Sequence, residues 1–330
     1  MDSSSIFSSK RRFAFKLSLF IVLLAILDAG IGGLLREFYF RQTSGLSYRL
    51  TYAMDHSTDD VIVLGSSRAQ VHYVPSIIEK ITGKSCYNAG RDGQSLLFSY
   101  AVQEAIIKRH QPDVLILDLI PRDFFNLSIH YDRLSALLPY YDSHEEIRPI
   151  VHLRSRFERL KLISHIYPFN SLPLQIAKYN LVKGEELDGY VPQFGEMTPL
   201  MQTQEEENAP WSRKGLDPNM VRAFESLVEN CVDSKIVLFI VISPAYQGKA
   251  PGMFAIDKLK EIMENCSFEI WDYSNHSDFA NETRLFRDQS HLNYDGARLF
   301  TDLVAKRINA TLGQDSKEFS FRQAATAKKN

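Results

Sequence analysis

The feature that most constrains the fold is a set of five short apolar segments without polar alternation. They occupy residues 61–67, 86–90, 113–120, 235–243 and 267–274. Strands that are apolar on both faces are typical of a parallel sheet covered by helices on both sides. Helical patterns separate these segments, at residues 75–81, 95–109, 251–264 and 295–310, with another helix that Asp217 and Pro218 begin before the fourth segment. We therefore predict an α/β fold with three layers and a doubly wound parallel sheet.

The N-terminus predicts a membrane anchor. An apolar stretch over residues 17–35 follows the basic residues Lys10, Arg11, Arg12 and Lys16. As a helix this stretch would be about 28 Å long, close to the hydrocarbon thickness of a bilayer. Asp28 costs about 2.5–3.5 kcal/mol at the centre of a span, which the twelve Leu, Ile, Val and Phe residues outweigh, and we interpret it as a tolerated polar residue near the outer end. The basic flank predicts residues 1–16 in the cytoplasm and everything after Arg36 on the far side.

A cleaved signal peptide is the alternative to a retained anchor. Residues 17–27 alone would form its apolar region, but the small residues that follow lack a clean A-x-A cleavage site. This pattern favours an anchor that is retained. In both cases the remaining chain is predicted to be extracytoplasmic.

The remaining chain divides into three parts, the second of which carries an insertion. Residues 37–58 are mixed and polar and predict a stalk, residues 59–312 the α/β domain, and residues 313–330 a polar tail. Within the domain, residues 124–232 far exceed the usual connection of about 2–6 residues. They predict a helical insertion that covers the site, with helices over residues 145–162 and 172–182.

Composition excludes several classes of function. A formal net charge of −2 with balanced signs argues against nucleic-acid binding. The three cysteines are widely spaced and odd in number, which argues against a disulfide framework and a metal or redox centre. We expect no cofactor and no metal.

Three distant segments carry candidate catalytic groups. Ser67 follows the first apolar run and Gly65, at the carboxyl end of a strand, where ligands bind in open α/β sheets. Asp288 precedes His291 by three residues, so its carboxylate can reach Nδ1 and leave Nε2 free to take the serine proton. Gly93, in the glycine turn after the second strand, and the Ser67 amide are candidate oxyanion donors. The structural alternative is that Ser66, Ser67 and Asp288 only cap helices.

These motifs, in this order, resemble the SGNH/GDSL hydrolase superfamily over roughly residues 60–311. The resemblance implies a flavodoxin-like sheet, Ser67 as nucleophile, His291 as base, Asp288 as its orienting carboxylate and Gly93 as the oxyanion glycine. The third block of the family, Gly-x-Asn-Asp, is replaced here by the sequence DLIPRD at residues 118–123. The asparagine donor is therefore absent, and Arg122 or Asn126 is the candidate replacement.

The anchor, the Gly-Ser-Ser sequence and the modified third block also resemble envelope proteins that acylate bacterial polymers, such as the alginate O-acetylation proteins and the D-alanyl transfer protein of teichoic acid synthesis. This resemblance implies a serine esterase or O-acyltransferase that acts on an acylated cell-envelope glycan or polymer, with a membrane acyl-donor protein as a partner. Two alternatives stay open: a lipid or small-ester hydrolase, and a catalytically inactive scaffold or binding protein of an envelope assembly.

Overall fold

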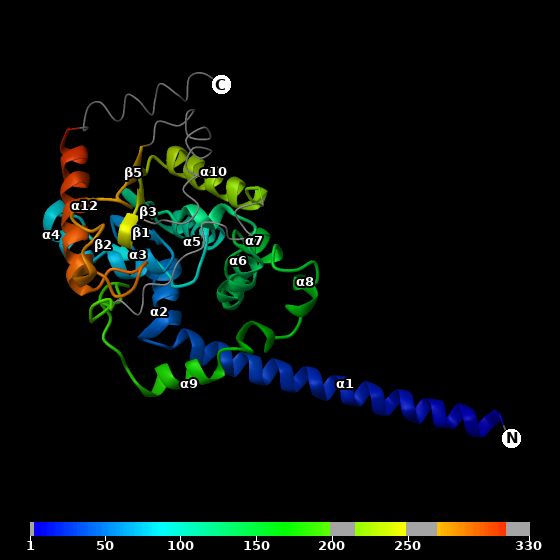
Figure 1. The fold of residues 1–330 in the computed structure, drawn as a ribbon. Coiled ribbons are helices and arrows are strands. Elements are labelled where there is room, and N and C mark those ends of the chain that lie inside the picture. Colours follow the sequence, from blue (N-terminus) through cyan, green and yellow to red (C-terminus); the bar gives the residue numbers. More distant parts are fainter. Residues whose placement is uncertain (1–2, 199–214, 249–268, 315–330) are drawn as a thin grey trace, which may run out of the picture.

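A five-stranded, all-parallel sheet forms the centre of the protein. The computed structural model describes residues 3–198, 215–248 and 269–314. The sheet has the order β2-β1-β3-β4-β5 (Figure 1). Its strands are β1 (Val61–Gly65), β2 (Cys86–Asn88), β3 (Val114–Asp118), β4 (Val237–Ile242) and β5 (Ile270–Asp272). Each strand lies inside one of the five predicted segments, so the α/β prediction is confirmed.

Helices cover both faces of the sheet. One face packs against α4 (Pro75–Thr82) and α12 (Tyr294–Gln314), and the other against α5 (Leu96–Arg109) and α10 (Pro218–Asp233) (Figure 1). Successive side chains of β1 enter opposite cores: Ile62 packs on the α5 side and Val63 on the α12 side. This division follows from the period-2 geometry of a strand and explains why the segments carry no polar alternation.

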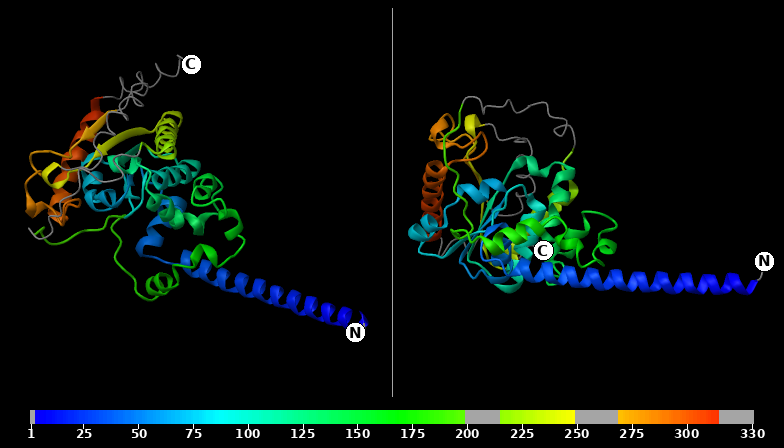
Figure 2. Two further views of the ribbon diagram at one scale, coloured as in Figure 1. Left: turned by 45° about the vertical axis from the view of Figure 1, so that its right-hand side comes forward. Right: turned by 90° about the horizontal axis from the view of Figure 1, so that it is seen from below.

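The N-terminal helix α1 (Ser3–Phe40) projects away from the domain in every view (Figure 2). Residues 10–40 are long and apolar enough to cross a membrane. Most described side chains between residues 10 and 27 are exposed, as expected for a surface that faces lipid.

Residues 37–58 do not form the predicted polar stalk. The π-helix η1 (Tyr52–His56) packs against α5, and α2 (Gly45–Thr51) contacts both η1 and α1. Leu50, Ala53 and Met54 are buried in the core on that face, together with Tyr39. Their i, i+3, i+4 spacing is that of a short helix with one apolar face, which the mixed composition concealed.

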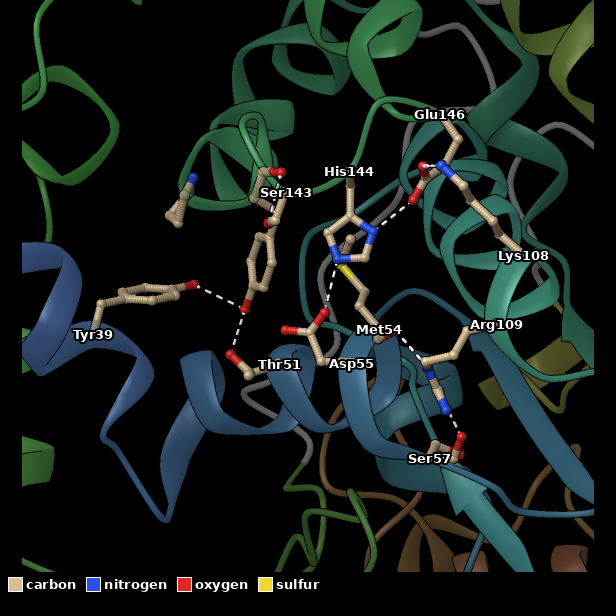
Figure 3. A network of polar contacts seen from close by, with 12 residues as sticks. Tyr39, Thr51, Met54, Asp55, Ser57, Lys108, Arg109, Ser143, His144 and Glu146 are labelled. Carbon is tan, nitrogen blue, oxygen red and sulfur yellow. Dashed lines mark hydrogen bonds and ion pairs between the residues drawn. The ribbon is translucent and has the colours of Figure 1, made fainter.

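A polar network fastens this segment to the domain (Figure 3). His144 lies between two carboxylates, with Nε2 2.8 Å from Asp55 and Nδ1 2.5 Å from Glu146. Lys108 of α5 donates to Glu146 at 2.8 Å. Burial opposes a charge on His144, but the hydrogen bonds to both carboxylates outweigh it and raise its pKa.

The insertion is helical but differs in detail from the prediction. It follows η2 (Pro121–Phe124) and contains α6 (Ser128–Arg133), η3 (Leu134–Tyr140), α7 (Arg148–His152), α8 (Glu158–Lys161), η4 (Tyr167–Phe169) and α9 (Pro173–Leu181). The single helix expected over residues 145–162 is broken between α7 and α8. Ser155 Oγ accepts a hydrogen bond from the amide of Phe157, a local bond that competes with helix continuation. The helix expected over residues 172–182 is confirmed as α9.

The end of the predicted insertion belongs to the domain itself. Asp217 caps α10 by accepting a hydrogen bond from the amide of Asn219, and α10 packs on α5 and β4. The described elements are completed by α3 (Ser67–His72), η7 (Tyr246–Gly248) and η8 (Thr283–Leu285). The predicted helix at residues 251–264 and most of the predicted tail lie outside the described residues.

Candidate active site

Ser67 is the first residue of α3, directly beyond the end of β1. Gly65 has φ of +144°, and a Cβ there would lie 2.7 Å from the carbonyl oxygen of Asp118. Only glycine therefore lets β1 turn into α3 beside β3. Because Ser67 is at the first helical position, its amide has no acceptor within the helix. Ser66, the residue before α3, makes no side-chain capping bond, so the helix-capping interpretation does not describe this pair.

Ser67, His291 and Asp288 form one hydrogen-bonded chain. His291 Nε2 lies 2.7 Å from Ser67 Oγ, and its Nδ1 lies 2.9 and 3.0 Å from the two carboxylate oxygens of Asp288. Asp288 Oδ1 also accepts the amides of Ser290 at 2.9 Å and His291 at 3.0 Å. A carboxylate on Nδ1 places the proton of the neutral ring there, which leaves Nε2 as the acceptor for the serine hydroxyl.

The carboxylate of Asp288 is held in its charged form. Partial burial would raise the pKa of Asp288, but the hydrogen bonds from the His291 ring and from the amides of Ser290 and His291 lower it below its usual value. Asp288 therefore stays ionised at neutral pH. The side chains of His291 and Asp288 are 28% and 45% exposed, so the chain of hydrogen bonds opens to solvent.

His72 fixes the turn that carries His291. It lies on α3, five residues after Ser67, and is fully buried. Its Nε2 accepts the amide of Leu292 at 2.9 Å, and burial holds its pKa well below the usual value, so the ring is neutral. Sequence reasoning missed this residue, because an isolated histidine in a helix carries no motif.

Asn293, and not Asp288, caps the last helix. Asn293 Oδ1 accepts the amide of Gly296 at 3.0 Å, and its carbonyl accepts the amide of Ala297 at 2.8 Å. This arrangement leaves the carboxylate of Asp288 to His291. The capping alternative for Asp288 is therefore not the arrangement seen.

The glycine loop after β2 packs against the start of α3. Arg91 donates its amide to the carbonyl of Gly65 at 3.1 Å, and Asp92 to Gln70 Oε1 at 3.3 Å. A Cβ at Gly90 would lie 2.5 Å from the amide nitrogen of Gln70, so glycine allows this close approach. Gly93 follows with φ of +69°, and its amide makes no hydrogen bond within the part of the chain that the structure describes. That amide is available to a ligand.

Arg133 is a cation that contacts Gly93, the candidate oxyanion glycine. The side chain of Arg133, at the end of α6, lies so close to Gly93 that a Cβ there would overlap Nη1. Of the two candidates for the missing asparagine, Arg122 is half-buried and acts electrostatically on Asp123 and His130, and Asn126 is exposed. Among the described residues, neither side chain donates a hydrogen bond to Ser67, Gly93 or His291. The insertion thus supplies Arg133, which no motif indicates.

Buried acids occupy the third block. Burial raises the pKa of Asp118 to about 6, against the opposing effect of Arg68, and Asp118 accepts the hydroxyl of Tyr73 at 2.8 Å. Burial raises the pKa of Asp123 to about 7 and lowers that of His130 to about 4, with 3.7 Å between Asp123 Oδ1 and His130 Nε2. Burial thus disfavours the charged forms of all three side chains.

No protein-family model matches the sequence, and no curated protein matches it significantly. Within the described residues, no three His, Cys, Asp or Glu side chains gather as metal ligands.

Proposed function

We propose that the protein is a membrane-anchored, extracytoplasmic serine esterase or O-acyltransferase of the SGNH/GDSL type, acting on an acylated glycan or polymer of the cell envelope. The observation that carries the proposal is the continuous chain from Ser67 Oγ through His291 to Asp288. The sheet order supports it, because flavodoxin-like folds have the order 2-1-3-4-5 and bind ligands at the carboxyl ends of their strands.

The reaction has two steps, acylation of Ser67 and transfer of the acyl group to an acceptor. Ser67 Oγ attacks the acyl carbonyl while His291 Nε2 takes the proton of the serine hydroxyl. The resulting oxyanion accepts hydrogen bonds from the amides of Ser67 and Gly93. The ester C–O bond then breaks, and His291 returns the proton to the leaving alcohol. Water or a sugar hydroxyl next attacks the acyl-enzyme, with His291 again as base, and frees Ser67.

Arg133 compensates for the missing asparagine donor. Its guanidinium contacts Gly93, whose amide we assign to the developing negative charge. A positive charge beside the reacting carbonyl stabilises the oxyanion of the transition state more than it stabilises the neutral ester. A triad that is partly exposed to solvent suits a substrate larger than the site, such as a polymer.

The test is acyl release and transfer by the full-length chain in detergent micelles. We expect acetate release from an O-acetylated polysaccharide, or transfer to a deacetylated one, and loss of both in Ser67→Ala. Ser66→Ala is the matched control, because the Ser66 hydroxyl is buried without a partner among the described residues. Turnover of phospholipid or short esters alone would favour the small-ester hydrolase, and turnover of none would favour the inactive scaffold.

A further inference from the structure

The carboxylate of Asp28 in α1 is bound by the domain's own chain. Its Oδ1 accepts the hydroxyl of Ser164 at 2.5 Å and the amide of Ile166 at 3.3 Å. Its Oδ2 accepts the amide of His165 at 2.7 Å and lies 3.2 Å from the ring Nδ1 of that residue. One turn later, a Cβ at Gly32 would overlap the backbone of His165. The turn after α8 is therefore docked directly on α1.

The length of α1 places this turn at the membrane. Arg12 to Asp28 is sixteen residues, or about 24 Å of helix, which is less than the ~30 Å hydrocarbon thickness. If the charge of Arg12 marks one boundary and the long side chain of Lys16 reaches back to it, Asp28 lies about 6 Å inside the opposite boundary, and the turn bonded to it lies at that depth. The span is then shifted toward the N-terminus from the expected residues 17–35.

The segment of residues 156–166, which we call the α8 segment, has the surface of an interfacial element. Phe157, Leu160 and Ile163 are 52%, 65% and 71% exposed, beside the exposed apolar face of α1. The guanidinium of Arg156 covers the ring of Phe157 at 4.5 Å, and Arg159 is close by in sequence. Apolar side chains flanked by arginines match an acyl-chain boundary with anionic headgroups.

The backbone of this segment is also suited to a region of low water content. Each amide from residue 160 to residue 167 donates a hydrogen bond, to a carbonyl within the segment, to Asp28 or to Ser164 Oγ. Unpaired amides at membrane depth would cost several kcal/mol each. A solvated loop has no need of such complete pairing.

We propose that the α8 segment is a second membrane contact, with Phe157, Leu160 and Ile163 among the lipid acyl chains and Arg156 and Arg159 among the headgroups. Together with α1, it holds the domain in one orientation on the bilayer surface. The proposal depends on α1 spanning the membrane and is independent of catalysis.

The experiment compares two labelled positions in the full-length chain. An environment-sensitive nitrobenzoxadiazole label is attached at Ile163→Cys or at Leu181→Cys, both in a Cys266→Ser background, because Cys86 and Cys231 are buried. Leu181 is 83% exposed and follows Asn180, whose side chain donates to the carbonyl of Phe38. Phe38 is ten residues beyond Asp28, or about 15 Å further from the membrane.

Each protein is reconstituted into nanodiscs of phosphatidylcholine and phosphatidylglycerol. We expect the label at position 163 to emit at shorter wavelength, and a lipid spin-labelled near the headgroup to quench it several-fold more strongly than aqueous iodide does. The label at position 181 should show the reverse. Equal iodide quenching at both positions would overturn the proposal. Protection of position 163 in native membranes but not in nanodiscs would assign the surface to a protein partner, and cleavage of α1 in cells would also refute it.

Discussion

The replacement Asp288→Asn tests the role of the carboxylate most sharply, because the structure dictates how asparagine would sit. Asp288 Oδ1 accepts two amides, from Ser290 and His291, so the asparagine carbonyl oxygen turns toward them. Its NH2 group then faces His291 Nδ1, where Oδ2 now lies at 3.0 Å. An NH2 donor at this position favours the tautomer with the proton on Nε2, which cannot accept the proton of Ser67. We expect kcat to fall on the order of 10³- to 10⁴-fold, about 4–5.5 kcal/mol of activation free energy.

The assay is hydrolysis of p-nitrophenyl acetate by the full-length chain, with thermal unfolding measured in parallel. Asp295→Asn is the matched control, since Asp295 is exposed and lies only four residues after His291. The fold of Asp288→Asn should survive, because the two amides keep an acceptor. A loss in kcat of less than tenfold in a folded Asp288→Asn variant would refute the assigned role of Asp288.

Three further predictions concern Gly65, Asp123 and Arg133. Gly65→Ala should lower the free energy of unfolding, measured in urea, by at least about 2 kcal/mol, because φ is +144° and the new Cβ would lie against the carbonyl oxygen of Asp118. Gly83→Ala is the control and should cost less, because Gly83 also has positive φ but its Cβ would meet no neighbour. Burial raises the pKa of Asp123 to about 7, so the contribution of the protonated side chain to stability is lost as pH rises from the unfolded-state value of about 4 through 7. Between pH 5 and 8 the wild type should lose about 2.5 kcal/mol relative to Asp123→Asn. Arg133→Ala should lower kcat roughly tenfold with little change in KM, and Arg122→Ala should not.

The strands could be predicted because buried parallel strands leave short continuous apolar runs, which the much longer apolar run of α1 exceeds in length. The packing of residues 37–58 could not, since only Leu50, Ala53 and Met54 signal the buried face of two short helices. The break between α7 and α8 depends on one local hydrogen bond from the amide of Phe157 to Ser155, which competes with a helix that the composition allows equally well.

In the candidate site, too, some residues could be predicted from the sequence and others could not. Ser67, Asp288 and His291 could be named from sequence because Ser67 follows the first strand, Asp288 precedes His291 by three residues before the last helix, and this order resembles the SGNH/GDSL pattern. His72 and Arg133 could not, because their roles come from packing between distant segments. The bond between Asp28 and the turn after α8 joins residues 136 to 138 positions apart, which no pattern in α1 alone reveals.

The most direct test of the account is covalent labelling of Ser67 by a fluorophosphonate probe, followed by peptide mass spectrometry of the full-length chain. A nucleophile activated by His291 attacks phosphorus, and the probe is retained on Oγ. We predict labelling at Ser67, none in Ser67→Ala or His291→Ala, and undiminished labelling in Ser66→Ala. A folded wild-type protein that takes up no probe at Ser67, or a His291→Ala variant that labels as fast as the wild type, would contradict the proposal that these side chains form a working nucleophile.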